Sequence, residues 1–310
     1  MTSFKGTDIL SGKQFTREGL DKILDVAAHM DQQLADVGSL DLLDGYVMGS
    51  LFFEPSTRTR LSFETAMHRL GGDVVGFAQA GTSSVAKGES LNDTIRTVNQ
   101  YVDVIVMRHP EIGSAMQAAG VSTVPILNGG DGAGQHPTQA LLDLYTIHVE
   151  RGGVDGNTIA LCGDLKNGRT VHAGVELYKH YDCDLVFVAP EALEMPTEIT
   201  ERLEQEGVEV RETADLEAAL AQADVLYMTR IQKERFEDPD EYERLKGSYV
   251  LTREMVERVN PDVTIMHPLP RVNEITTDVD DLPGAAYFRE ARNGVPVRMA
   301  LLALVMGVVG

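Results

Sequence analysis

The sequence predicts an α/β protein of two doubly wound parallel-sheet (Rossmann-like) domains, with a ligand site in the cleft between them. Apolar segments of strand length alternate with segments of helical spacing, which is typical of parallel sheets covered by helices on both faces. The glycines at 152–153 divide this alternation into two series, which predict one domain over 1–150 and a second over 151–289. Arginine, histidine and hydroxyl side chains recur directly after the predicted strands, where open parallel sheets bind their ligands.

The composition is that of a globular protein, and its charge balance narrows the choice of ligand. The 310 residues suffice for two domains of ordinary size, and 43% of them are hydrophobic. A formal net charge of −21 argues against nucleic acid as a partner, and it makes each local basic cluster more informative. The excess of acidic residues favours a halophilic-type surface adapted to high salt; the alternative is an acidic protein from an ordinary cytosol.

Cysteine usage and hydropathy predict a soluble cytoplasmic protein without a metal site. Cys162 and Cys183 lack C-x-x-C spacing, and no set of cysteine and histidine residues matches the spacing of a zinc site. The chain does not begin with the basic and apolar segments of a secretory signal. The longest apolar tract, 300–309, is shorter than the about 20 residues that cross a bilayer.

In the first domain, the residues predicted to bind a ligand begin after a strand over 46–53. The stretch 56–60, Ser-Thr-Arg-Thr-Arg, follows Pro55 and precedes apolar residues at helical spacing up to Leu70. The free N–H groups and the macrodipole of a helix N-terminus favour negative charge, and the hydroxyl and guanidinium groups here are further donors. The stretch therefore predicts an anion site; the alternative is an ordinary Ser/Thr cap followed by surface arginines.

The rest of the first domain brings further polar residues to predicted strand ends. Its expected elements are helices over 17–36, 90–98, 112–119 and 138–150 and strands over 74–77, 104–107 and 123–127. Arg108 follows one strand, and a glycine-rich loop, 129–134, leads from another to His136, which is either a neutral hydrogen-bond donor or a simple loop residue. Lys87 lies in a polar loop, 81–89, that either reaches another site or is an ordinary surface loop.

The second domain repeats the pattern, with predicted strands over 158–162, 185–189, 208–211, 225–228 and 263–266. Beyond strand ends stand Arg169, Arg230, Gln232 and His267. Guanidinium forks bind carboxylates through paired hydrogen bonds, so this wall suits a small carboxylate, although a surface ion pair is the commoner role of a single arginine. The charged segment 236–247 predicts a mobile loop or lid, and we expect a last helix, 290–310, to pack back on the first domain.

The sequence shows no obvious residues for covalent or metal catalysis. Neither a Ser/His/Asp triad, nor a cysteine nucleophile, nor a metal cluster is evident. We therefore expect a direct reaction between two bound anions, in which the protein supplies orientation and charge stabilisation. The competing class is a non-catalytic anion-binding protein, which would lack part of the phosphate or oxyanion set, whereas this chain has all of it.

Five motifs resemble those of the transcarbamoylase family, in order and over nearly the whole chain. They are Ser56–Arg60, Arg108–Pro110, His136–Gln139, Gly163–His172 and His267–Arg271. The segment Thr229–Arg235, the Lys87 loop and Pro268 resemble members that carbamoylate aspartate rather than ornithine or an acylated ornithine. The chain departs from the commoner family pattern at Asn167 and in the 129–134 loop.

The resemblance implies transfer of a carbamoyl group from carbamoyl phosphate to L-aspartate, without cofactor or metal, in pyrimidine biosynthesis. It assigns phosphate binding to Ser56, Thr57, Arg58, Thr59 and Arg108, and contact with the carbamoyl oxygen to Thr59, Arg108 and His136. It assigns the carbamoyl amino group to Gln139 and the backbone carbonyls of Leu269 and Pro270, and the aspartate carboxylates to Arg169, Arg230 and Gln232. It places Ser83 and Lys87 in the site of a neighbouring subunit of a homotrimer, and some members of the family also bind regulatory chains.

Glu54 lies directly before the 56–60 stretch and carries a further expectation. We expect its carboxylate to pair with Arg169 or Arg235 once both ligands are bound. Such a pair would couple the filling of the two walls to closure of the domains.

Overall fold

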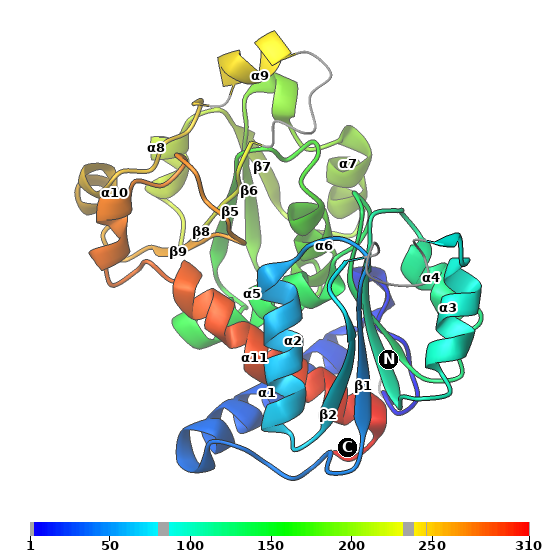
Figure 1. The fold of residues 1–310 in the computed structure, drawn as a ribbon. Helices are drawn as coiled ribbons and strands as arrows, with labels where there is room; N and C mark the ends of the chain where they lie inside the picture. Colours follow the sequence, from blue (N-terminus) through cyan, green and yellow to red (C-terminus); the bar gives the residue numbers. More distant parts are fainter. Residues whose placement is uncertain (1–2, 80–86, 232–238, 246, 310) are drawn as a thin grey trace. The chain divides into compact units, whose positions relative to one another are not determined.

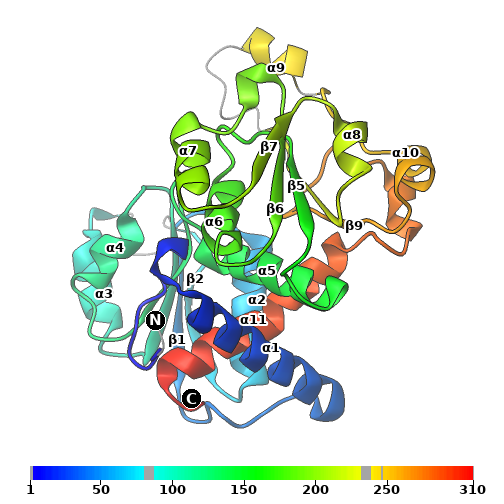
Figure 2. The same ribbon diagram turned by 180° about the vertical axis from the view of Figure 1, so that it is seen from behind.

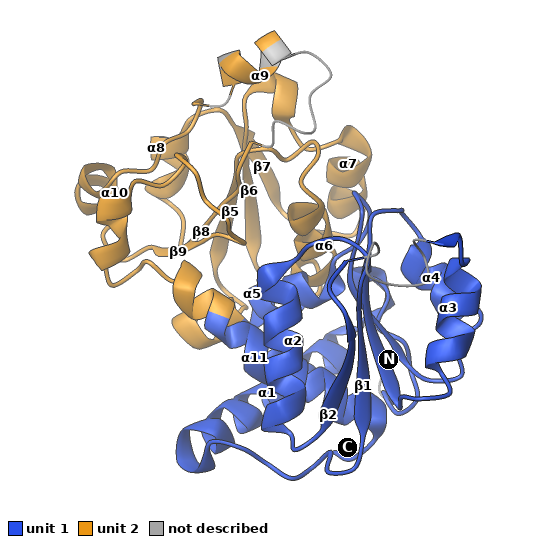
Figure 3. Ribbon diagram, in the orientation of Figure 1, with its two compact units in different colours: residues 1–145, 292–310 blue, residues 146–291 orange. Residues whose placement is uncertain are grey.

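The computed structural model describes residues 3–79, 87–231, 239–245 and 247–309 (Figure 1). The chain divides into two compact units (Figure 3). Unit 1 comprises residues 1–145 and 292–310, and unit 2 comprises residues 146–291. The chain leaves unit 1 within helix α5 (Pro137–Arg151) and returns to it within helix α11 (Tyr287–Met306).

Unit 1 is a parallel sheet with helices on both faces. Its strands are β1 (Val47–Phe52), β2 (Asp73–Phe77), β3 (Val104–His109) and β4 (Ile126–Asp131), in the order β2-β1-β3-β4. Its helices are η1 (Gly12–Gln14), α1 (Arg17–Val37), α2 (Thr57–Arg69), α3 (Leu91–Val98) and α4 (Ser114–Ala119), besides the shared α5 and α11. Helices α3 and α4 lie on one side of the sheet, and α1, α2 and α11 lie on the other (Figures 1 and 2).

Unit 2 has the same construction around a sheet of five parallel strands. The strands are β5 (Thr158–Cys162), β6 (Asp184–Val188), β7 (Val210–Thr213), β8 (Val225–Met228) and β9 (Thr264–Met266), in the order β7-β6-β5-β8-β9. The helices are α6 (Arg169–Tyr178), η4 (Glu191–Leu193), α7 (Thr197–Gln205), α8 (Leu216–Leu220), α9 (Pro239–Leu245), α10 (Arg253–Val259) and η6 (Thr277–Asp281). The two parallel sheets with their helices confirm the predicted fold class.

Each sheet reverses its strand order once, and this fixes where a ligand can bind. In unit 1 the chain moves outward from β1 to β2 and then crosses to β3 on the other side of β1. In unit 2 it moves from β5 outward to β7 and crosses to β8 on the other side of β5. Doubly wound sheets bind ligands at the carboxyl ends of the two strands that flank such a reversal. These strands are β1 and β3 in unit 1, and β5 and β8 in unit 2.

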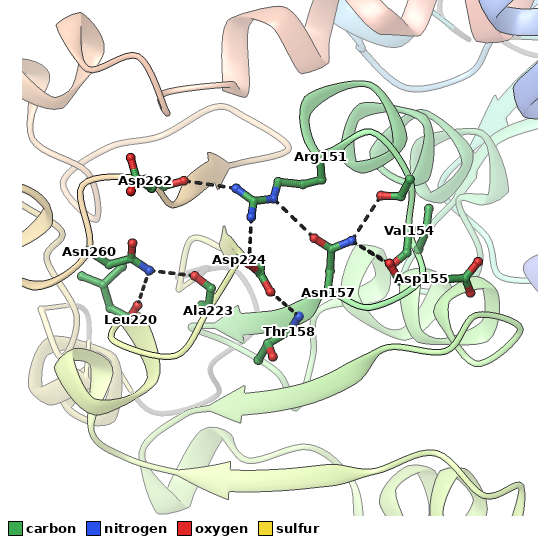
Figure 4. Close-up of polar contacts among 11 residues, drawn as sticks. Arg151, Val154, Asp155, Asn157, Thr158, Leu220, Ala223, Asp224, Asn260 and Asp262 are labelled. Carbon is green, nitrogen blue, oxygen red and sulfur yellow. Dashed lines mark hydrogen bonds and ion pairs between the residues drawn. The ribbon is translucent and has the colours of Figure 1, made fainter.

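The amino ends of the same strand pairs are joined by aspartates. The carboxylate of Asp103, directly before β3, accepts the N–H of Val47 in β1 at 2.8 Å. Asp224, directly before β8, accepts the N–H of Thr158 in β5 at 2.9 Å. Arg151 at the end of α5 donates to Asp224 at 2.7 Å and to the carbonyl of Asp262 at 3.2 Å (Figure 4). These contacts fix the edge of each sheet opposite the predicted ligand site.

Two predicted loops are wrong in part. The 129–134 stretch was expected to be a loop, but β4 continues to Asp131, because its pairing with β3 goes on through an irregularity to the pair His109–Asp131. The 236–247 segment was expected to be a mobile loop or lid; residues 239–245 form helix α9 rather than a loop, whereas a role as a lid stays a prediction. Residues 236–238 and 246 of that segment lie outside the described residues.

The second half of helix α11 is buried. Every residue from Val297 to Val305 is at most 2% exposed, whereas Phe288 near the start of the helix is 57% exposed. Among the described residues, no helix is both long and apolar enough to span a membrane.

Candidate active site

The start of α2, directly after β1, offers hydrogen-bond donors that the helix itself does not use. Ser56 is the N-cap residue, but its hydroxyl makes no capping hydrogen bond. The backbone N–H groups of the first turn of this helix have no partners within the helix. Thr59 is 5% exposed, and its methyl group lies against Gly129 at the end of β4. The predicted anion stretch thus begins a helix of 13 residues at the strand reversal of unit 1.

Two arginines bring positive charge to this helix end. Partial burial and the positive charge of Arg108 together lower the pKa of Arg58. Arg108, at the carboxyl end of β3, donates Nε–H to Glu54 Oε1 at 2.6 Å and Nη1–H to the carbonyl of Gly129 at 3.3 Å. Its guanidinium is therefore held across the ends of three strands. An anion bound here would relieve the repulsion between the two guanidinium groups.

The glycine-rich end of β4 lets Arg108 and His136 approach the same point. Gly130 has φ +119°, and a Cβ atom there would lie 3.0 Å from Arg108 Nη1 and 3.5 Å from His136 Cδ2. Any other residue at this position would be strained and would press against the Arg108 guanidinium. Asn128 fixes the turn by accepting the N–H of Gly130 at 2.8 Å. His136 is only 4% exposed, so its side chain is packed in place, and its role as a hydrogen-bond donor stays a prediction.

Arg60, the second arginine of the predicted anion stretch, pairs with a carboxylate of its own helix in this structure. Its Nη1 lies 3.1 Å from Glu64 Oε1, one helical turn further on. The same carboxylate oxygen accepts the hydroxyl of Ser50 in β1 at 2.9 Å, so Glu64 joins α2 to the sheet. We therefore take Arg58 and Arg108 as the basic side chains of the proposed site.

In unit 2 the strand reversal again carries the predicted arginines. Arg169 is the first residue of α6, and Arg230 follows the end of β8 by two residues; both are half-buried. Thr229 closes the space between the strand ends by donating its hydroxyl to the carbonyl of Cys162 at 3.0 Å. Asn167 caps the preceding loop through hydrogen bonds to Asp164 at 3.0 and 3.1 Å. The unusual Asn167 thus has a structural role. Gln232 lies outside the described residues.

A buried histidine shapes the loop after β9. His267 accepts the N–H of Leu269 on Nδ1 at 2.8 Å, so the ring proton is on Nε2, which lies 2.7 Å from Glu274 Oε1. Burial raises the pKa of Glu274, but the hydrogen bonds from His267 and from the backbone outweigh it, and the pKa is lowered overall. Leu269 has φ 55°, a conformation that residues other than glycine rarely adopt. The histidine therefore sets the direction of the backbone at the predicted carbonyl pair, Leu269 and Pro270.

The predictions for Lys87 with Ser83, and for Glu54, stay predictions. Lys87 is exposed, at the start of the described residues that follow the gap, whereas Ser83 lies outside them. Glu54 pairs with Arg108 in this structure, and its pairing with Arg169 or Arg235 after ligand binding stays a prediction. Within the described ranges, no group of three or more His, Cys, Asp or Glu side chains is arranged to hold a metal ion.

Three residues that support the site were not singled out from the sequence. Asp143 accepts a hydrogen bond from the side chain of Gln139 at 2.8 Å, and its spacing of four residues on a predicted helix was a usable signal. Glu274 and Glu290 hold His267 through its ring and its backbone N–H, at 2.7 and 2.8 Å. Nothing in the sequence pairs these two glutamates with that histidine.

The fold and these residues define a two-domain α/β transferase that matches a known family in both halves. The family model described as the aspartate/ornithine carbamoyltransferase carbamoyl-P binding domain matches residues 7–149. The model of the Asp/Orn binding domain of the same enzymes matches residues 155–305. The chain belongs to the aspartate/ornithine carbamoyltransferase family.

Its relatives within the family carry a more particular name. The aspartate carbamoyltransferase catalytic subunit of Thermococcus kodakarensis is 54% identical over 307 residues, which cover 99% of each chain. That of Methanopyrus kandleri is 53% identical over 308 residues, again 99% of each.

Solved structures of the same enzyme superpose closely on this chain. Aspartate transcarbamoylase from Trypanosoma cruzi, in complex with carbamoyl phosphate and aspartate, has a TM-score of 0.93 and 45% identity, covering 98% of both chains. The catalytic subunit of the M. jannaschii enzyme has a TM-score of 0.90 and 51% identity, covering 96% of both chains.

Proposed function

We propose that the chain transfers the carbamoyl group of carbamoyl phosphate to the α-amine of L-aspartate, giving N-carbamoyl-L-aspartate and phosphate. One observation carries this proposal above the others. Arg108 and His136 approach the same glycine, Gly130, beside the N-terminus of α2, in a chain about half identical to catalytic subunits of that activity. The reaction is an early step of pyrimidine biosynthesis.

Unit 1 binds carbamoyl phosphate. The hydroxyls of Ser56, Thr57 and Thr59, the first N–H groups of α2 and the guanidinium groups of Arg58 and Arg108 receive the phosphate. Thr59, Arg108 and His136 donate to the carbamoyl oxygen, which becomes negative in the tetrahedral intermediate. A placed donor of this kind lowers a reaction barrier by about 3–4 kcal/mol.

Unit 2 binds aspartate. The side chains of Arg169, Arg230 and Gln232 receive its two carboxylates. The side-chain carboxylate of aspartate favours an arginine as its partner, whereas the side-chain cation of ornithine would need an anionic partner. The neutral α-amine attacks the carbamoyl carbon, and the new C–N bond gives the tetrahedral intermediate. Collapse of this intermediate breaks the C–O bond to phosphate. The amine proton goes to the leaving phosphate. The carbonyls of Leu269 and Pro270, together with Gln139, accept from the carbamoyl amino group.

A comparison of acceptors tests the proposed function. We expect the purified chain to carbamoylate L-aspartate, with a kcat/KM at least about 10³-fold above that for L-ornithine, because a buried site built for two carboxylates leaves a cation unpaired. Product formation is measured by colorimetric detection of the ureido group. Faster carbamoylation of ornithine or an acylated ornithine would assign the chain to another transcarbamoylase. Tight binding of carbamoyl phosphate without transfer to any acceptor would make it a non-catalytic anion-binding protein.

We also propose that the active protein is a homotrimer in which Ser83 and Lys87 complete the site of a neighbour. Lys87 is exposed in the single chain, and an exposed lysine flanked by small residues suits a role in another subunit. In a closed ring of three subunits, each subunit uses one surface to give and a different surface to receive.

Mixing two inactive variants tests the shared site. Lys87→Gln and Arg58→Gln should each be nearly inactive, and subunits exchanged at equal amounts should regain roughly a quarter of the wild-type activity, because random pairing restores that share of sites. Activity is measured after denaturing and refolding the mixture, and each variant refolded alone is the control. A mixture that stays as inactive as its components would place Lys87 and Arg58 in the same subunit's site.

Three further expectations rest on composition and resemblance alone. Regulatory chains remain possible partners, because relatives are named catalytic subunits. A cytoplasmic location stays a prediction, and so does adaptation of the surface to high salt, for which the net charge of −21 is the support.

A further inference from the structure

The side-chain amide of Gln139 has a fixed orientation in unit 1. Its Nε2 donates to Oδ1 of Asp143, one turn further along α5, at 2.8 Å. A carboxylate only accepts hydrogen bonds, so it selects the orientation in which the amide turns its NH2 group toward Asp143. The amide oxygen, an acceptor, is then the group that Gln139 can offer to a ligand.

Asp143 in turn faces a buried positive charge. Asp143 is 0% exposed and Arg298 of α11 is 2% exposed. Burial lowers the pKa of Arg298 to about 10, and the negative charge of Asp143 acts in the opposite direction. The electrostatic interaction of the two side chains therefore takes place away from water, where it is strong.

The Arg298 guanidinium is itself held from two further sides. It lies over the ring of Phe63 in α2, with Cζ 4.9 Å from the ring centroid. It also packs against Gly294, where a Cβ atom would come within 2.2 Å of Nη1. Arg298 thus contacts the helix whose N-terminus is proposed to bind phosphate, and it interacts electrostatically with Asp143 of the helix that carries Gln139.

We infer that Asp143, with Arg298 as its buried counter-charge, is a positioning residue that makes Gln139 select an amino group over a methyl group on the substrate carbonyl. The inference rests on the proposed function, which has Gln139 accept a hydrogen bond from the carbamoyl NH2. Acetyl phosphate has a methyl group in place of that NH2 and nearly the same shape. A fixed amide oxygen of Gln139 accepts a hydrogen bond from carbamoyl phosphate but has no partner when acetyl phosphate is bound.

The selection depends on both charges. If Asp143 became asparagine, the cation of Arg298 would attract the new amide oxygen and turn its NH2 group toward Gln139. Gln139 would then present its own NH2 group to the ligand. If Arg298 were removed, the buried carboxyl of Asp143 would favour its neutral form, which can donate to Gln139 and reverse it in the same way.

The test is the ratio of two dissociation constants, for acetyl phosphate and for carbamoyl phosphate, measured by calorimetry on the wild-type and variant proteins. We expect Asp143→Asn and Arg298→Met each to lower this ratio about tenfold, the value of one hydrogen bond. Arg298→Lys loses the planar group over Phe63 but keeps the positive charge, and it should hold the ratio within about twofold of the wild type. Unfolded molecules lower the amount of protein that binds but leave the ratio of the two dissociation constants unchanged. Partial unfolding of a variant would therefore not lower this ratio.

Two further variants keep the test decisive. Arg292 lies on α11, as Arg298 does, and pairs with Asp31 of α1. Arg292→Met removes this ion pair and should leave the ratio unchanged. The double variant Asp143→Asn/Arg298→Met buries no charge and has neither the carboxylate nor the cation that fixes the amides, so Gln139 can turn either way. Its ratio should lie between the wild-type value and that of Asp143→Asn, even where a single variant fails to fold. An unchanged ratio in the variants that bind either ligand would overturn the inference, and so would a wild-type protein that does not prefer carbamoyl phosphate. The proposed function is judged separately, by transfer to aspartate.

Discussion

Replacing Arg108 by methionine is expected to lower kcat by about 10²–10³-fold, which is the loss seen when one donor to a developing oxyanion is removed. Arg108 is held at the end of β3 by Glu54 on one edge and by the carbonyl of Gly129 on another. Methionine fills similar space without the charge, so the sheet and Gly130 keep their places. The measurements are kcat with saturating substrates and the dissociation constant of inorganic phosphate, which should rise at least about tenfold.

Arg60→Met is the matched control for this experiment. Arg60 lies in the same basic stretch, but its guanidinium pairs with Glu64 at 3.1 Å and not with the groups around Gly130. We expect a kcat within about threefold of the wild type and a small loss of stability, as is typical of a half-exposed ion pair. Equal losses of kcat in the two variants would mean that the geometry around Gly130 does not carry the chemistry.

The sequence predicted where the strands end better than it predicted which strands lie side by side. Apolar runs ending at Phe53 and Met107 located β1 and β3, because buried parallel strands are continuous apolar segments. That β1 and β3 lie side by side is decided by hydrogen bonds between segments about fifty residues apart, and no local pattern encodes it. Which residues follow the strand ends was therefore predictable from the sequence, but how they lie relative to one another was not.

The glycines of β4 show why the geometry was beyond reach. A run of glycines normally indicates a loop, and the sequence was interpreted in that way. In the structure β4 runs on through Gly129 and Gly130, and Gly130 has a positive φ and would bring a Cβ atom within 3.0 Å of Arg108 Nη1. Only the three-dimensional neighbours reveal that requirement. The link between Gln139 and Asp143 was different, because spacing of four residues on a helix is visible in the sequence.

Replacing Arg230 by methionine is expected to raise the KM for aspartate by about 10²-fold or more, because truncating one partner of a desolvated charge pair costs about 2–5 kcal/mol. Arg230 follows β8 at the strand reversal of unit 2, and its backbone is fixed by the hydrogen bond of its neighbour Thr229 to Cys162 at 3.0 Å. The dissociation constant of carbamoyl phosphate should stay within about twofold, since the proposed phosphate groups belong to unit 1.

The comparison of the two ligands gives this experiment its power. If the variant had partly unfolded, a smaller fraction of its molecules would bind carbamoyl phosphate. Calorimetry reports that fraction as a lower binding stoichiometry. Arg211→Met provides the control, because Arg211 pairs with Asp184 at 3.2 Å on the far strands of the same sheet. It removes the same charge from unit 2 and should leave the KM for aspartate unchanged. If both variants raised it equally, the net charge of the unit, and not a carboxylate contact at β8, would govern aspartate binding.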